Sequence, residues 1–224
     1  MKINRVTFTG PDIHTDVNEL KAIQNDYPFV EWGILISGNP NIKRHPPKEF
    51  IESLKDTGLN LSLHLCAKYS SDIMKKGIIE IPYEFFSRYQ INFNFKFSKH
   101  NIEYYEQLTN KYKNKNFILQ YNRSNEPYVK DIIHKYNMSN TNILFDASGG
   151  RGTEISSIEK PFFGIYTGYS GGIYPDNVID ICNKISNYKN HDNVWIDMES
   201  GVRTDDVFDL NKVKDVLKKV EKFI

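Results

Sequence analysis

Two carboxyl side chains stand where a catalytic acid or base is expected. Asp146 precedes the run Ala-Ser-Gly-Gly-Arg-Gly, and Asp197 begins the run Asp-Met-Glu-Ser-Gly-Val. A positioned carboxyl group can donate or remove a proton in a transition state. We therefore interpret Asp146 and Asp197 as candidate acid–base residues beside glycine-rich loops.

The same loops carry residues that are suited to binding an anion. Glycine lets the backbone approach a ligand closely, and free N–H groups where a loop enters a helix bind phosphate well. Another such loop, Ser-Gly-Gly-Ile-Tyr-Pro-Asp-Asn-Val, spans residues 170–178. The candidate ligand-binding residues of these loops are Gly150, Gly171, Gly172, Glu199, Ser200 and Gly201.

A metal site is a weaker chemical alternative. Carboxylates with one imidazole suit divalent ions, so His64, Asp146, Asp197 and Glu199 form a conceivable ligand set for a metal-dependent hydrolase. No tight ligand spacing supports such a site. We expect no metal and no organic cofactor, and we keep His64 as a candidate ligand-binding residue.

A regular alternation of strand and helix patterns would position these residues. The strand candidates are residues 4–9, 30–36, 59–66, 91–97, 117–122, 142–147, 163–168 and 194–199. Apolar stripes at helical spacing, such as Val178, Ile181, Cys182 and Ile185, lie between them. Thr15 and Asp209 are the expected caps of the first and last helices. This order predicts an α/β fold, a single (β/α)8 TIM barrel with residues 1–224 as one domain.

Polar and apolar residues alternate along these strands. Leu61, Leu63 and Leu65 share one face of their strand, while Ser62 and His64 share the other. Amphipathic helices need an apolar surface to cover, so the polar face should line the barrel axis. The expected polar lining comprises Arg5, His64, Asn92, Lys96, Asp146, Asp197 and Glu199. The same alternation suits an antiparallel sandwich, which the helical length of the connecting segments disfavours.

A polar barrel interior is either a self-satisfied network or a ligand cavity. We assign the network to residues early in their strands, which are Arg5, Glu31, Asn92 and Asn94. Chemistry in TIM barrels takes place at the carboxyl ends of the strands. The residues expected there are Thr9, Cys66, Lys96, Asn122, Asp146 and Glu199.

The charge, the apolar runs and the cysteines of the chain disfavour several classes of protein. The formal net charge of +1, from 29 Lys and Arg against 28 Asp and Glu, disfavours a nucleic-acid or anionic-membrane partner. No apolar run approaches the ~20 residues that a membrane helix needs. The start of the chain alternates like a strand and does not resemble a signal peptide. Cys66 and Cys182 lie far apart, so a cytoplasmic location without disulfides is expected.

Three segments resemble the phosphoribosylanthranilate isomerase family. Residues 170–178 match that family's loop after strand seven, and Ile-Asp-Met-Glu-Ser-Gly-Val-Arg at 196–203 matches its strand-eight motif. Ile-Lys-Arg-His-Pro-Pro at 42–47 resembles the family's stretch after strand two. The family carries out an Amadori rearrangement in a TIM barrel.

The resemblance implies roles for individual residues. It implies that Asp146 is the general acid, that Asp197 helps to hold the reacting sugar, and that Arg44 binds a substrate carboxylate. It also implies that the loops at 171–172 and 200–201 bind the phosphate. Two positions depart from the family: Thr9 occupies the place of the base cysteine, and Glu199 replaces the first serine of the strand-eight motif. A carboxylate beside a phosphate site costs affinity unless Glu199 points away or is paired, for instance by Arg203 or Lys96.

Two functions follow from this pattern. The first is an isomerase that acts on a small phosphorylated sugar derivative, with Asp146, Asp197 and Thr9 as the catalytic residues. The alternative is a non-catalytic barrel that binds or sequesters a phosphorylated or nucleotide-like metabolite, which the loss of the cysteine at Thr9 favours. In either case we expect a small phosphorylated metabolite as partner and a monomer or homodimer.

Overall fold

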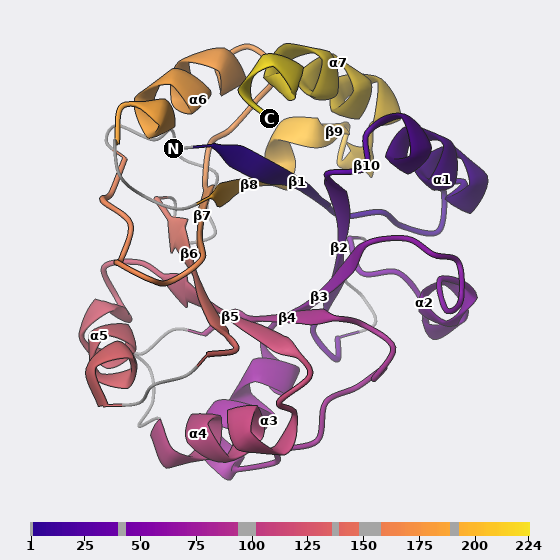
Figure 1. Cartoon of the computed structure of the whole chain (residues 1–224). Helices are drawn as coiled ribbons and strands as arrows, with labels where there is room; N and C mark the ends of the chain where they lie inside the picture. Colours follow the sequence, from indigo (N-terminus) through magenta and orange to yellow (C-terminus); the bar gives the residue numbers. More distant parts are fainter. Residues whose placement is uncertain (1, 40–43, 94–101, 136–138, 148–157, 189–192) are drawn as a thin grey trace.

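Eight parallel strands close into a barrel in the computed structural model of the chain (Figure 1). The structure describes residues 2–39, 44–93, 102–135, 139–147, 158–188 and 193–224. Each strand pairs with the next in sequence order, and the last pairs with the first. The strands are β1 (Ile3–Thr9), β2 (Val30–Ile36), β3 (Leu61–Leu65), β4 (Arg88–Ile91), β5 (Asn116–Tyr121), β6 (Thr141–Asp146), β7 (Thr167–Ser170) and β8 (Val194–Met198). The predicted α/β barrel is confirmed.

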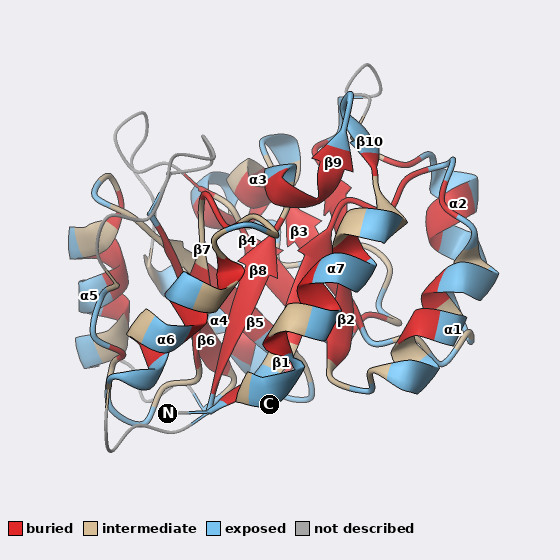
Figure 2. Cartoon of the chain, turned by 90° about the horizontal axis from the view of Figure 1, so that it is seen from above, coloured by how far each residue is buried: buried red, intermediate tan, exposed pale blue. Residues whose placement is uncertain are grey.

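Helices surround the barrel and bury their apolar stripes against it, as the red inner faces in Figure 2 show. They are α1 (Val17–Asp26), α2 (Lys48–Ser53), α3 (Lys68–Lys76), α4 (Ile102–Lys111), α5 (Glu126–Lys135), α6 (Val178–Ser186) and α7 (Leu210–Val220). Asp209 caps α7 as expected, because its carboxylate accepts from the N–H groups of Asn211 and Lys212. The cap of α1 is Asp16 rather than Thr15.

Three elements differ from the sequence prediction. β4 begins at Arg88 and not at Ile91, because Arg88 is a charged residue that the barrel buries beside a carboxylate. β7 begins at Thr167 and not at Phe163, whose side chain is 93% exposed. α3 was not anticipated, since it offers little beyond Ile73 and Met74 as a buried apolar stripe. Residues 94–97 of the predicted fourth strand, with Asn94 and Lys96, lie outside the described residues.

An ion-pair network fills the part of the barrel where the strands begin. Glu31 accepts from Arg88 at 2.7 Å and from Thr7 at 3.0 Å, and its other oxygen lies 3.3 Å from Arg5. Burial alone would raise the pKa of Glu31, but the charges of Arg88 and Arg5 outweigh burial and lower it. These are the ion pairs that the sequence predicted around Arg5 and Glu31, but Arg88 Nε and Nη2 have no hydrogen-bond partner among the described residues, so the network is only partly satisfied. Asn92 is not part of it.

A small apolar cluster separates this network from the opposite end of the barrel. It consists of Ile118, Leu144 and Trp195. The Arg88 guanidinium lies 4.5 Å from the centre of the Trp195 ring. Gly168 makes room for that ring, because a Cβ at this position would lie 2.2 Å from it. The barrel interior therefore holds ion pairs where the strands begin, this apolar cluster next to them, and polar side chains where the strands end.

Among the helices that the structure describes, none combines the length and the hydropathy of a membrane-spanning segment.

Candidate functional site

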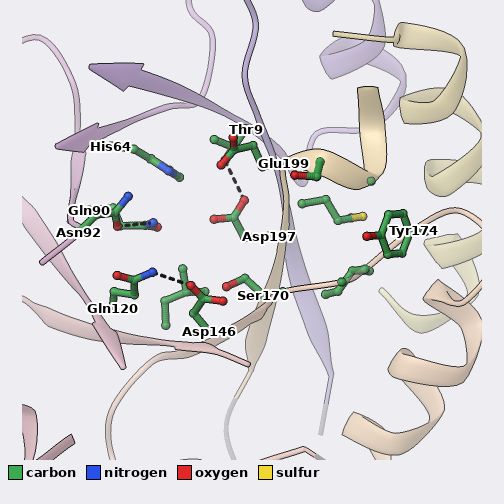
Figure 3. Close-up of a pocket in the computed structure, with 17 residues that line it drawn as sticks. Thr9, His64, Gln90, Asn92, Gln120, Asp146, Ser170, Tyr174, Asp197 and Glu199 are labelled. Atoms are coloured by element: carbon green, nitrogen blue, oxygen red, sulfur yellow. Dashed lines mark hydrogen bonds between the residues drawn. The ribbon is translucent and has the colours of Figure 1, made fainter. Parts of the chain in front are cut away.

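A polar pocket opens where the strands end (Figure 3). It collects side chains from the ends of β1, β3, β4, β5, β6, β7 and β8, together with the loops after β7 and β8. The 17 described residues that line it are Thr9, His64, Gln90, Asn92, Gln120, Leu144, Asp146, Ser170, Gly171, Gly172, Ile173, Tyr174, Asp197, Met198, Glu199, Ser200 and Gly201. The pocket thus brings together most of the residues that the sequence singled out.

Asp146 and Asp197 lie in one lateral row of the sheet. Asp146 is in register with Ser170 on β7, and Ser170 is in register with Asp197 on β8. Because β7 lies between their strands and neighbouring strands are ~4.8 Å apart, the Cα atoms of the two aspartates are about 10 Å apart. Both are buried, with 6% and 5% of their surface exposed. The Gln120 amide donates to Asp146 Oδ2 at 2.5 Å, so this carboxyl group is held from the β5 side.

The environment of Asp197 favours its protonated form. Burial is the main reason that the pKa of its carboxyl group rises to about 8. The hydrogen bond from Thr9 opposes this rise, while the negative charges of Glu199 and Glu31 add to it. A carboxyl group with such a pKa can release and take up a proton near neutral pH.

Thr9 contacts Asp197 directly. Its hydroxyl donates to Asp197 Oδ1 at 2.8 Å, and both side chains are buried. Gly33 on β2 leaves the space beside Thr9 open, since a Cβ there would lie 2.4 Å from Thr9 Oγ1 and 2.9 Å from His64 Nε2. Thr9 therefore contacts Asp197 on one side and lies near His64 Nε2 on the other, and Figure 3 shows all three side chains lining the pocket.

His64 and Cys66 are poor bases in this setting. Burial lowers the pKa of His64 to about 4, so its imidazole is a weak proton acceptor. Burial raises the pKa of the Cys66 thiol to about 11, so thiolate is scarce at neutral pH. Of His64, Cys66 and Asp197, the Asp197 carboxyl group has the pKa closest to neutrality.

The two glycine loops pack against one another. Gly171 and Gly172 have φ angles of 93° and 61°, a region that favours glycine. A Cβ on Gly201 would lie 1.9 Å from the carbonyl oxygen of Ile173, so the loop after β8 touches the loop after β7. Asn177 braces the latter by accepting from the Tyr174 N–H at 2.8 Å. Gly150 belongs to residues 148–157, which lie outside the described residues.

Arg44 and Glu199 form an ion pair at the rim. Arg44 Nη1 lies 2.7 Å from Glu199 Oε1, and Arg44 Nε lies 2.6 Å from Asp206 Oδ1. The partner of Glu199 is therefore Arg44 and not Arg203, which donates instead to the carbonyl oxygen of Gly10 at 2.8 Å. The other expected partner, Lys96, lies outside the described residues. This pairing draws Glu199 toward the rim.

Sequence reasoning missed the amides Gln90 and Gln120, which line the pocket. Gln90 precedes the predicted fourth strand, which begins at residue 91, whereas β4 begins at Arg88. Gln120 stands in the apolar run Phe-Ile-Leu-Gln, where only its place near the strand end could have marked it. Of the predicted strand-end residues, Asn122 lies outside this pocket, and its carboxamide instead accepts from the Ser124 N–H.

The described residues contain no group of three or more His, Cys, Asp or Glu side chains able to hold a metal ion. His64, Asp146, Asp197 and Glu199 share the pocket without forming a ligand cluster. The site thus presents carboxyl groups, amides and glycine loops, which suit acid–base chemistry on a polar ligand.

Two solved structures superpose on the whole barrel of this chain. A structure described as monomers of dimeric phosphoribosylanthranilate isomerase from Thermotoga maritima superposes with a TM-score of 0.61. Its sequence identity is 15%, over 98% of this chain and 99% of that chain. A D-tagatose 3-epimerase-like protein superposes with a TM-score of 0.53 at 13% identity, over 99% of both chains. At these identities the likeness concerns the fold.

A search of curated proteins finds no match to the chain. The family model for N-(5′-phosphoribosyl)anthranilate (PRA) isomerase, however, matches residues 99–219. This match spans more than half of the chain and contains Asp146, both described glycine loops and Asp197. It leaves out the β1 end at Thr9 and the segment of Arg44. The chain belongs to the PRA isomerase family.

Proposed function

We propose that the chain is an isomerase that converts a small phosphorylated aldose derivative into the corresponding ketose derivative. The observation that carries this proposal is the row formed by Asp146, Ser170 and Asp197 beside the loops at 171–172 and 200–201. Those loops supply N–H groups for a phosphate. The row supplies two carboxyl groups that face the same ligand.

Each carboxyl group would serve one half of the rearrangement. Asp146 protonates the ring oxygen of the sugar, the bond from that oxygen to C1 breaks, and an iminium forms between C1 and the amine nitrogen. A base then removes the proton at C2, and the electron pair of that C–H bond forms a C1–C2 double bond while the iminium becomes a neutral amine. The resulting enol tautomerises to the ketone, because the hydroxyl group on C2 gives up its proton and C1 gains one. The net change is an isomerisation without a redox partner.

We propose that Asp197 takes the proton from C2 in place of the family's cysteine. With a pKa of about 8, this group is a stronger base when ionised than an ordinary carboxylate. About one molecule in ten is ionised at pH 7, which limits the rate but does not abolish it. Thr9 orients the carboxylate through its 2.8 Å hydrogen bond and is a positioning residue.

The alternative is a barrel that binds a phosphorylated or nucleotide-like metabolite without converting it. Specific observations favour it: Thr9 cannot serve as a base by itself, and burial makes His64 and Cys66 poor bases. Arg44, which would recognise a substrate carboxylate, lies between Glu199 and Asp206. In that case the glycine loops still hold phosphate.

Turnover of phosphoribosylanthranilate by the purified chain tests the proposal. We expect activity that falls at least about a hundredfold in Asp146→Asn, since general acid catalysis contributes about that much. The matched control is Asp26→Asn, which changes an exposed aspartate at the end of α1. An inactive wild type that gains turnover with Thr9→Cys would support the binding alternative, because only the base would be missing.

The domain organisation, location and oligomeric state of the chain are also open to test. We propose that residues 1–224 act as one domain in the cytoplasm and that the chain is a monomer or a homodimer. The T. maritima enzyme is described as dimeric, which makes a homodimer the first state to test. Light scattering of the purified chain distinguishes the two states.

A further inference from the structure

The Arg44 guanidinium holds two carboxylates at the rim of the pocket. Its Nη1 lies 2.7 Å from Glu199 Oε1, and its Nε lies 2.6 Å from Asp206 Oδ1. Nη1 also donates to Ser200 Oγ at 3.4 Å. Glu199 and Ser200 both line the pocket. Arg44 therefore contacts the part of the pocket wall that the loop after β8 provides.

The two carboxylates differ in how they are held. Asp206 lies in the turn of a hairpin formed by β9 (Arg203–Thr204) and β10 (Val207–Phe208), and it is not among the 17 described residues that line the pocket. The buried Arg203 guanidinium anchors this turn, because it donates to the carbonyl oxygens of Asp206 and of the residue after β1, at 2.8 Å each. Glu199 lines the pocket itself. A ligand in the pocket therefore meets Glu199, while Asp206 holds Arg44 from the hairpin.

Glu199 occupies a position on Arg44 that a ligand carboxylate needs. A carboxylate binds guanidinium best through two parallel N–H groups on one edge. The end of the Arg44 guanidinium, formed by Nη1 and Nη2, is such an edge, and Glu199 engages Nη1. A second carboxylate placed there beside Glu199 would meet a like charge at close range. Glu199 and a ligand carboxylate therefore compete for the same end of Arg44.

The ion pair between Arg44 and Glu199 is weak enough to be exchanged. Its side chains are 34% and 38% exposed, and ion pairs in contact with water contribute little because solvent screens them. A ligand whose phosphate is bound at the glycine loops presents its carboxylate to Arg44 at a high effective concentration. A molecule that carries only a carboxylate lacks this advantage. Exchange therefore favours a ligand with both groups.

We propose that Glu199 is a specificity-determining residue. In the free chain it occupies the end of Arg44 that binds the ligand carboxylate, and it gives way to a ligand that carries both a phosphate and a carboxylate. This inference rests on the proposed function in one respect, namely that the phosphate lies at the glycine loops. It also explains how Arg44 can be paired in the free chain and still bind a substrate such as phosphoribosylanthranilate.

Calorimetry with two matched ligands tests the exchange. They are ribitol 5-phosphate with a 2-carboxyphenylamino group at C1 and its phenylamino analogue, which differs only in lacking the carboxylate. Both are open-chain alcohols, so neither is isomerised. Glu199→Gln should raise the preference for the carboxylate ligand, measured as the ratio of the two Kd values, about fivefold. Any effect of the lost charge on phosphate binding is common to both ligands and cancels in this ratio. An unchanged ratio would overturn the proposal.

Two further variants show whether the effect passes through Arg44. Asp205→Asn removes a charge from the same exposed turn as Asp206, at a φ of 51° that asparagine tolerates, and should leave the ratio unchanged. Arg44→Gln removes the cation for which the carboxylates compete. In that background Glu199→Gln should no longer change the ratio. A fivefold rise that persists without Arg44 would contradict the exchange.

Failure of the proposed function can be told apart from failure of the exchange. If neither phosphorylated ligand binds, the proposed function fails. NMR titration with 2-aminobenzoate at high concentration then tests Arg44 alone. Glu199→Gln should bind this carboxylate more tightly than the wild type, and Arg44→Gln should abolish the gain. Equal binding by the wild type and Glu199→Gln, or no binding by either, would refute the role of Glu199.

Discussion

The hydroxyl group of Thr9 donates a 2.8 Å hydrogen bond to the carboxyl group of Asp197, which joins the ends of β1 and β8 inside the pocket. The family resemblance places a base cysteine at this position of β1. Here the same position holds a hydroxyl group that orients a neighbouring carboxyl group. In the mechanism that we propose, the base is therefore Asp197 on β8 and not a residue of β1.

Removal of the Thr9 hydroxyl should alter both the rate and its pH dependence. Thr9→Val keeps the shape of the side chain but deletes the hydrogen bond that lowers the pKa of Asp197. We expect turnover to fall about tenfold and the rise of kcat/KM with pH to move to higher pH. Rates measured across neutral pH would show this shift, whereas Thr9→Ser should restore the wild-type profile. A rate loss without any pH shift would assign Thr9 a purely structural role.

Asp197 should make the wild type less stable as pH rises. Its pKa is about 8 in the folded chain and ~3.9 when unfolded, so between these values the folded state binds the extra proton. Stability from this group therefore falls by about 1 kcal/mol per pH unit within that window. Asp197→Asn removes this dependence. Urea titration measures the unfolding free energy of both proteins. The difference between them, variant minus wild type, should become more positive from pH ~5 to pH ~7, because only the wild type loses stability in this range. Parallel curves would contradict the assignment.

A methyl group at Gly33 should disturb the site from the neighbouring strand. The added Cβ would lie 2.4 Å from Thr9 Oγ1 and 2.9 Å from His64 Nε2. We expect Gly33→Ala to cost about 1–3 kcal/mol of stability and to displace Thr9 from Asp197. In a Thr9→Ala background the collision with the hydroxyl disappears, so the same substitution should cost clearly less. Equal costs in the two backgrounds would show that Thr9 and Gly33 are not coupled.

The buried ion pairs at the other end of the barrel should control stability alone. Glu31→Gln leaves Arg88, which is 3% exposed, without its carboxylate and should cost about 3–5 kcal/mol. Glu19→Gln is the matched control, because its 3.7 Å pair with Lys214 is exposed and contributes about 0–1 kcal/mol. Denaturant titration compares the two variants. Similar small losses would mean that Arg88 finds another partner or water.

Much of this architecture could be predicted from local patterns. Alternation along Leu61, Leu63 and Leu65 identified a strand with one face toward the helices, and Asp209 identified the start of α7. Those signals depend on neighbours within a few residues. The starts of β4 and β7 could not be predicted in the same way, because Arg88 is buried only when Glu31, 57 residues away, supplies the opposite charge.

The sequence by itself determined the succession of strands and helices, the aspartates at two strand ends and the glycine loops, since each is encoded by residue type and spacing. Only the tertiary structure decided which groups meet. It placed Thr9 against Asp197, 188 positions apart, paired Arg44 with Glu199, and turned Gln90 and Gln120 into the pocket. The physical reason is that barrel closure sets the register between distant strands. Register determines which side chains are buried together, and burial shifts their pKa values.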